Sequence, residues 1–226
     1  MSRKSHHPRT AQKRARLLLV DDHPMVRERL AEVINREPDL TVSGEAEDRH
    51  EALEEIRAHP PDLAIVDLKL KSSDGLELIK DIRNRWPKLP MLVVSMHDES
   101  LYAERVIRAG AQGYITKQEA TRKILQAIRR VLEGGIYLNE KTASNIIGRL
   151  ASHGSPVSAT PAEILADREF QVFELTGQGL NTHEIARRLH VAVKTVETYR
   201  ARIKEKLKLK DASDLLQSAI LWSRQQ

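Results

Sequence analysis

Short apolar segments alternate with longer amphipathic stretches through the first 135 residues of the chain. Five segments have the length and the residue types of β-strands: Arg16–Val20, Leu40–Gly44, Leu63–Val66, Met91–Val94 and Tyr114–Thr116. After each of them, apolar residues recur every three or four positions, as in Tyr102–Ala109 and residues 121–133, which is typical of a helix with one buried face. Strands that are buried on both faces belong to parallel sheets. The pattern predicts an α/β domain in which a doubly wound, five-stranded parallel sheet carries helices on both faces.

The remainder of the chain has a different pattern. Gly134 and Gly135 end the fifth helix, a further helix is predicted at 140–150, and residues 151–162 are rich in small residues, Gly and Pro. From Leu165 onward only helical periodicity is present. We therefore predict four parts: a disordered basic tail at 1–15, the α/β domain at 16–135, a connecting helix and linker at 136–164, and a small all-α domain at 165–226.

The formal charge of +5 is unevenly distributed. Residues 1–16 carry six basic and no acidic residues, residues 17–150 carry three more acidic than basic residues, and residues 165–226 carry three more basic than acidic residues. A basic C-terminal domain on an acidic body suits binding to a polyanion, although so small an excess also serves solubility alone. The absence of cysteine excludes disulfides and thiolate metal sites. No apolar segment approaches the length needed to span a bilayer, so we expect a cytoplasmic protein without membrane contact.

Polar residues follow the ends of four predicted strands. Asp21 and Asp22 follow the first strand, Asp67 the third, Ser95 the fourth and Lys117 the fifth. Taken singly, each has an ordinary alternative role, such as a helix cap, a turn hydroxyl or a solvated charge. Together they are expected to meet, because the carboxyl ends of parallel strands form the ligand-binding edge of such a sheet.

A cluster of three carboxylates is costly unless a cation balances it. Oxygen ligands with room for water favour Mg²⁺. A metal ion of this kind permits a phosphoryl group to approach a carboxylate, with Lys117 and Ser95 binding its oxygens. Asp67 is then the expected nucleophile, and the product is an acyl phosphate.

These residues, with Asp74-Gly75 after Asp67, resemble the receiver domain of two-component response regulators over roughly residues 16–135. The resemblance implies a flavodoxin-like (CheY-like) fold with strand order 2-1-3-4-5. It also implies phosphotransfer from a histidine kinase to Asp67. The chain departs from the family pattern at Lys71, where a proline is usual.

The same resemblance assigns further roles. It implies that Mg²⁺ is held by Asp22, Asp67 and the backbone carbonyl of Lys69, with Asp21 assisting. It also makes Ser95 and Tyr114 a switch pair that responds to phosphorylation. A protein of this kind is a regulatory phosphoacceptor and not an enzyme.

Other classes fit the residues less well. A phosphatase of the haloacid dehalogenase type needs a second Asp two residues after the nucleophile, where this chain has Lys69. A flavodoxin-type flavin binder needs a phosphate-cradling loop after the first strand, where the sequence Asp21-Asp22-His23 repels phosphate. Two alternatives stay open: a regulator whose first domain serves only for protein interaction, and a Mg²⁺-dependent phosphohydrolase.

The C-terminal part contains two short helices joined by a turn. Asn181 and Glu184 form a capping box at the start of the first. The second is predicted at 194–207, and such a pair suggests a helix-turn-helix. Its outward residues suit contact with DNA, and we assign Lys194 and Arg202 to phosphates and three further residues to base edges: Thr195, Glu197 and Thr198.

Residues 165–222 also resemble the LuxR-type DNA-binding domain, in the segments 165–169, 181–186 and 194–207. Together the two resemblances indicate the NarL/FixJ class of transcriptional regulators, which control transcription by phosphorylation and bind double-stranded DNA. The chain departs from the pattern at Ala192, where a capping Ser is usual. The helix predicted at 212–222 has surplus apolar residues, and the resemblance favours a homodimer that forms on phosphorylation.

Overall fold

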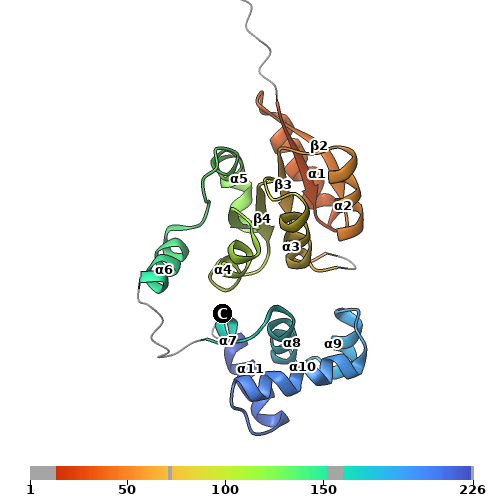
Figure 1. The fold of residues 1–226 in the computed structure, drawn as a ribbon, viewed down its shortest axis with the longest axis vertical. Helices are drawn as coiled ribbons and strands as arrows, with labels where there is room; N and C mark the ends of the chain where they lie inside the picture. The colour runs from red at the N-terminus through yellow and green to blue at the C-terminus, as the bar shows by residue number, and fades with distance from the viewer. Residues whose placement is uncertain (1–13, 71–72, 152–159, 225–226) are drawn as a thin grey trace, which may run out of the picture. The chain divides into compact units, whose positions relative to one another are not determined.

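The computed structural model describes residues 14–70, 73–151 and 160–224. It divides into two compact units between Asn139 and Glu140 (Figure 1). Most of the predicted N-terminal tail, Lys71 and the middle of the predicted linker lie outside the described residues. Within the described part of the chain, every helix is too short or too polar to cross a lipid bilayer.

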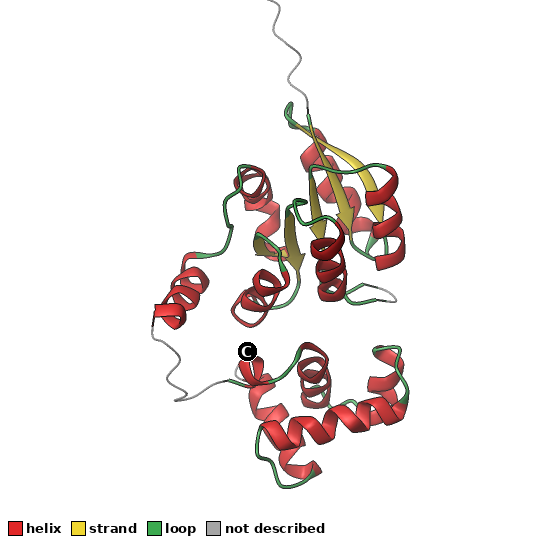
Figure 2. Ribbon diagram, in the orientation of Figure 1, coloured by secondary structure: helices red, strands yellow, loops and turns green. Residues whose placement is uncertain are grey.

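The first unit is built on a parallel five-stranded sheet (Figure 2). Its strands are β1 Ala15–Val20, β2 Leu40–Ala46, β3 Leu63–Val66, β4 Met91–Ser95 and β5 Gly113–Thr116. The order in the sheet is β2-β1-β3-β4-β5, and all paired strands are parallel. The predicted flavodoxin-like fold is therefore confirmed. The order reverses beside β1, so the ends of β1 and β3 lie next to each other.

Five helices cover the sheet: α1 Pro24–Asn35, α2 Arg49–Ala58, α3 Gly75–Arg85, α4 Glu99–Ala109 and α5 Lys117–Leu132. One core contains Leu17 and Leu19 of β1 together with apolar residues of α1 and α5, such as Ile34 and Ile128. Because successive residues of a strand point to opposite faces, Leu18, which is also buried, belongs to the other face. The unbroken apolar strands are thus explained by burial on both sides.

Two helices begin earlier than their apolar pattern predicts. The fourth helix starts at Glu99 and not at Tyr102, because the Asp98 side chain caps it by accepting from the Ser100 N–H at 2.8 Å. The fifth starts at Lys117 and not at residue 121, because the Thr116 hydroxyl caps it. Lys117 is consequently the first residue of a helix, with little freedom in its backbone.

The second unit is entirely helical in its described part. Its helices are α6 Glu140–Ala151, α7 Pro161–Ile164, α8 Asp167–Gly177, α9 Thr182–Arg188, α10 Val193–Lys206 and α11 Ala212–Arg224. Helix α8 packs against both α10 and α11. Its fully buried Phe170 meets the ring of Trp222 edge to face, with 6.4 Å between the ring centroids.

The helix caps in this unit depend on whether the N-cap residue has a side-chain acceptor. Asn181 Oδ1 accepts from the N–H groups of His183 and Glu184, and Glu184 accepts from the Asn181 N–H at 2.8 Å, so the predicted capping box is confirmed. At Ala166, which has no side-chain acceptor, only the return bond from its N–H to Glu169 forms. Ala192 caps α10 without any side-chain hydrogen bond.

Candidate functional site

Three carboxylates and one ammonium group meet at the carboxyl edge of the sheet. Asp21 directly follows β1, Asp67 directly follows β3, and both are nearly inaccessible to solvent. The Lys117 Nζ lies 2.6 Å from Asp21 Oδ2 and 2.7 Å from Asp67 Oδ2. Single ligand atoms of Asp21, Asp22, His23 and Asp67 all lie within 4.8 Å of one another. The structure therefore brings together four of the five residues that the strand ends predict, and the fifth, Ser95, ends the next strand, β4.

The loop after β3 is held close to Asp67. The Lys69 N–H donates to Asp67 Oδ1 at 3.3 Å, and Lys69 forms an antiparallel bridge with Asp74. Asp74 in turn caps α3 by accepting from the Leu76 N–H at 2.9 Å. A Cβ atom on Gly75 would lie 2.0 Å from the backbone oxygen of Asp67. The glycine is thus required for the loop to return this closely beneath the carboxylate.

Among the described residues, the negative charge of the cluster is only partly balanced. Burial raises the pKa of Asp67, against the lowering effect of Lys117. Burial lowers the pKa of Lys117, but hydrogen bonds to Asp21 and Asp67 outweigh it and raise the pKa overall, so the ammonium group stays charged. With Asp22 counted, three carboxylates face one ammonium group, which leaves two negative charges when all are ionised.

One buried oxygen of the cluster has no hydrogen-bond donor. His23 Nδ1 lies 2.7 Å from Asp22 Oδ1, but its geometry does not make a hydrogen bond, and no other donor among the described residues reaches this atom. Buried carboxylate oxygens are normally satisfied. The site has an unsatisfied oxygen, a surplus of two negative charges, and oxygen donors beside one imidazole. These features fit a divalent cation such as Mg²⁺.

Ser95 and Tyr114 lie on the adjacent strands β4 and β5, and both are fully buried. His97 links them: its N–H approaches Ser95 Oγ at 3.4 Å, and its carbonyl accepts from the Tyr114 hydroxyl at 2.9 Å. Burial raises the pKa of Tyr114 and lowers that of His97. The two residues of the predicted switch pair therefore both contact the backbone of His97.

Sequence reasoning missed Arg27, a basic residue near the cluster. Its Nη1 donates to the Asp21 carbonyl at 2.5 Å, while its other nitrogens bind Glu45 and Glu47 at 3.0 and 3.2 Å. These contacts tie the acidic turn to the end of β2. His23 and His97 were also missed, because isolated histidines in loops carry no periodic or spacing signal.

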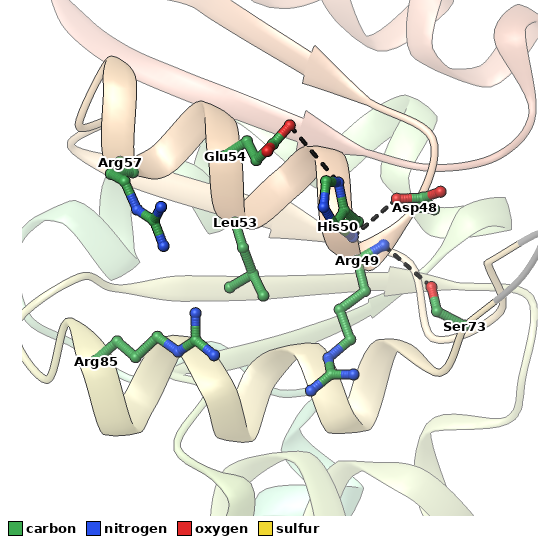
Figure 3. Close-up of a pocket in the computed structure, with 8 residues that line it drawn as sticks. All are labelled: Asp48, Arg49, His50, Leu53, Glu54, Arg57, Ser73 and Arg85. Atoms are coloured by element: carbon green, nitrogen blue, oxygen red, sulfur yellow. Dashed lines mark hydrogen bonds and ion pairs between the residues drawn. The ribbon is translucent and has the colours of Figure 1, made fainter.

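A cleft of about 430 Å³ lies between α2 and α3, away from the acidic cluster (Figure 3). Its lining includes three arginines and is made up of Asp48, Arg49, His50, Leu53, Glu54, Arg57, Ser73 and Arg85. The backbone N–H of Arg49 donates to Ser73 Oγ at 3.1 Å, and its side-chain Nε donates to Asp81 Oδ2 at 2.6 Å. These contacts join α2 to α3 and to the segment before it, and none of the four cluster residues lines the cleft.

In the second unit, α10 has one buried and one exposed side. Val196 and Ile203 are fully buried. Of the five predicted DNA-contacting residues, Thr195 is half-buried and four are exposed: Lys194, Glu197, Thr198 and Arg202. Arg200 donates to Thr182 Oγ1 at 3.0 Å, which fixes the start of α9 against α10.

The chain is thus a two-domain protein: a parallel-sheet unit with an acidic site at its switch point and a helical unit with an exposed polar helix. Comparison with family models agrees with this class. The response regulator receiver domain matches residues 17–129. The bacterial regulatory proteins of the luxR family match residues 163–219.

Individual relatives match over nearly the whole chain. The oxygen regulatory protein NreC of Staphylococcus haemolyticus is 32% identical over 209 residues, which cover 91% of this chain and 96% of NreC. A LuxR-family two-component response regulator from Aurantimonas sp. SI85-9A1 is 35% identical with a TM-score of 0.57 and covers 62% of this chain and 99% of its own. RcsB of Salmonella enterica, solved bound to a promoter, shares the fold, with a TM-score of 0.65, 23% identity and coverage of 92% and 98%.

The chain belongs to the NarL/FixJ class of two-component response regulators, which join a receiver domain to a LuxR-type DNA-binding domain. It is a phosphorylation-controlled, DNA-binding regulator of transcription. This family places the acidic cluster in the receiver domain and α10 in the DNA-binding domain.

The close approach at Gly75 predicts that Gly75→Ala destabilises the receiver domain by about 1–3 kcal/mol, because the added methyl group forces the backbone of the loop to move. Gly148→Ala is the matched control, since a Cβ there meets nothing within 4 Å, and it should be neutral or stabilising by up to about 1 kcal/mol. Urea denaturation followed by far-UV circular dichroism measures both. Equal midpoints for Gly75→Ala and wild type would contradict the prediction.

Proposed function

We propose that Asp67 accepts a phosphoryl group from a phosphohistidine of a histidine kinase. A carboxylate oxygen of Asp67 attacks phosphorus, the P–N bond breaks, and the departing imidazole nitrogen keeps the electron pair. The observation that carries this proposal is the position of Asp67: it is buried at the end of β3, in contact with the one ammonium group that also binds Asp21.

We propose that Mg²⁺ is held by Asp21, Asp22, Asp67 and the backbone carbonyl of Lys69. The unsatisfied Asp22 oxygen and the surplus negative charge support this assignment. When bound, the metal ion supplies the positive charge that lets a phosphoryl group lie beside carboxylates. Lys117 then balances a phosphoryl oxygen, and the Ser95 hydroxyl donates to another.

Switching follows from the contacts of Ser95. A phosphoryl group on Asp67 recruits the Ser95 hydroxyl, which in this structure accepts from the His97 N–H. Tyr114 moves with the same loop, because its hydroxyl is bound to the His97 carbonyl. We propose that this pair carries the phosphorylation state to the face formed by α4 and β5, and that the protein is a phosphoacceptor without turnover of its own.

In the DNA-binding domain, we propose that α10 reads double-stranded DNA in the major groove. The buried residues Val196 and Ile203 fix the helix and leave its polar side free. Lys194 and Arg202 bind phosphates, while Thr195, Glu197 and Thr198 reach base edges. We propose a cytoplasmic location, because a bacterial regulatory protein has to share a compartment with the DNA that it binds.

We also propose that phosphorylation produces a homodimer through α11. Leu215 and Ala219 are buried in the core of the domain, but Leu216 and Leu221 are 40% and 54% exposed. Two large apolar residues on one helix of a small domain favour a partner of the same kind, and a two-fold dimer matches paired half-sites in DNA.

Phosphotransfer is tested with a small phosphodonor and Mg²⁺. Intact-mass spectrometry should show one phosphoryl group on the wild type, and none on Asp67→Asn, because the nucleophile is removed. Asp48→Asn is the matched control outside the acidic cluster, since Asp48 caps α2 and Asn also caps a helix, and it should leave uptake unchanged. Chelation of Mg²⁺ should slow uptake at least about tenfold.

Other outcomes separate the alternatives. Labelling of Asp67→Asn at the wild-type rate contradicts the assignment of the nucleophile. Rapid release of many equivalents of phosphate by the wild type favours a phosphohydrolase. No uptake under any condition favours a domain that serves only for protein interaction.

DNA reading is tested with Lys194→Ala and Glu197→Ala on cognate and scrambled duplexes across a salt series. Loss of a phosphate contact at Lys194 should weaken binding to both duplexes. It should also reduce the slope of log affinity against log salt concentration by about one unit. Loss of a base contact at Glu197 should cost about 1–3 kcal/mol on the cognate duplex alone. Glu205→Ala, exposed on the last turn of the same helix, is the control. Wild-type binding by both variants would show that another element reads the DNA.

The dimer is tested by sedimentation of Leu216→Glu with and without phosphorylation. The wild type should shift from monomer to dimer on phosphorylation, whereas Leu216→Glu should remain a monomer because a carboxylate cannot be buried in an apolar interface. Gln217→Glu adds the same charge at the neighbouring exposed position and is the matched control. Its dimerisation on phosphorylation should be closer to that of the wild type than to that of Leu216→Glu. A phosphorylated wild type that stays monomeric would rule out this interface.

A further inference from the structure

A short segment after α5 pairs with the β5 edge of the receiver sheet. Residues 136–139, here called the strap, run beside β5, and Tyr137 forms a parallel bridge with Gly113. The Tyr137 N–H donates to the Gln112 carbonyl at 3.0 Å, and its carbonyl accepts from the Tyr114 N–H at 2.9 Å. A Cβ on Gly113 would lie 3.0 Å from the Tyr137 carbonyl oxygen, so glycine leaves room for the strap. The strap therefore pairs with the edge of β5 as a sixth strand would.

A second contact fastens the end of the strap to α4. Glu99, the first residue of α4, is only 3% exposed, and its Oε1 accepts from the Asn139 N–H at 2.7 Å. A hydrogen bond to a buried carboxylate is stronger than one between neutral groups, and its loss leaves a costly unpaired charge. The next residue, Glu140, begins α6.

Both anchors of the strap lie on the elements that contact the switch residues. One anchor is the backbone of Tyr114, whose hydroxyl holds the His97 carbonyl. The other is Glu99, two residues after His97 along the chain. Since the His97 N–H approaches Ser95 Oγ, a continuous set of contacts runs from Ser95 to Asn139.

We propose that the strap is a phosphorylation-controlled latch between the receiver site and α6. This proposal rests on the proposed roles of Asp67, Ser95 and Tyr114. When the Ser95 hydroxyl turns to a phosphoryl group, the loop at His97 loses its contact and shifts, Glu99 and Tyr114 move with it, and the hydrogen bonds of Tyr137 and Asn139 open. The chain entering α6 is then released from the receiver sheet.

Hydrogen–deuterium exchange of the full-length protein tests the latch. With Mg²⁺ and beryllofluoride as a phosphoryl mimic, the Lys69 amide beside Asp67 should become protected, while exchange at the Tyr137 and Asn139 amides should speed up about tenfold. Protection at Lys69 without faster exchange in the strap overturns the latch and leaves the phosphoacceptor site intact. No protection at Lys69 overturns both the proposed site and a latch controlled by it.

Two variants test the Glu99 anchor directly. Glu99→Ala removes the acceptor, and Asn139→Pro removes the donor N–H while leaving the carboxylate in place. In each variant, exchange at the Tyr137 amide should be about tenfold faster than in the wild type. The gain in DNA affinity that beryllofluoride produces, measured as the affinity with the mimic divided by the affinity without it, should fall at least about threefold. Glu28→Ala, which truncates an exposed glutamate of α1, is the matched control. Wild-type protection of Tyr137 in both variants, or an unchanged affinity ratio, would overturn the proposal.

Discussion

One ammonium group, on Lys117, holds the carboxyl edge of the receiver sheet together. Two like charges about 4 Å apart repel by about 4 kcal/mol at an effective dielectric constant of 20, so carboxylates as close as those of Asp21 and Asp67 need a shared cation. Lys117 lies within 2.7 Å of both. Because it cannot balance Asp22 as well, the edge keeps a surplus of negative charge. In the proposed phosphotransfer, an anionic phosphoryl group would approach Asp67 only after a divalent cation had removed that surplus, so the proposed phosphoacceptor would need a metal ion.

Much of this arrangement could be predicted from the sequence, because two local patterns were sufficient. Strands buried on both faces belong to a parallel sheet, and a parallel sheet collects the residues that follow its strands along one edge. Asp67 and Lys117 are 50 residues apart in the chain, yet both follow an apolar segment, and this was enough to place them together. The capping box of Asn181 and Glu184 was predictable for a similar reason, since all of its hydrogen bonds form within four residues.

The contacts that sequence could not predict join distant segments without a periodic signature. Arg27 of α1 reaches the Asp21 carbonyl, Glu45 of β2 and Glu47 just after it, and nothing in the sequence around Arg27 indicates these contacts. The bridge between Tyr137 and Gly113 consists of backbone hydrogen bonds, which any residue but proline can make. Helix starts at Glu99 and Lys117 were predicted too late, because caps at Asp98 and Thr116 extend each helix through polar residues that add nothing to its apolar face.

A change at Asp67 can reach α10 through the covalent chain or through a change of association. The strap lies on the first route, because it is hydrogen-bonded to the receiver sheet and continues directly into α6. The exposed leucines of α11 lie on the second, because they can bury their apolar surface only against another molecule or another part of the chain. Helix α10 itself is poorly suited to change shape: Val196 and Ile203 anchor its length, and Lys206 is bound to the buried Glu169 of α8 at 2.6 Å. If α10 reads DNA as proposed, regulation has to change the position of this helix and not its internal structure.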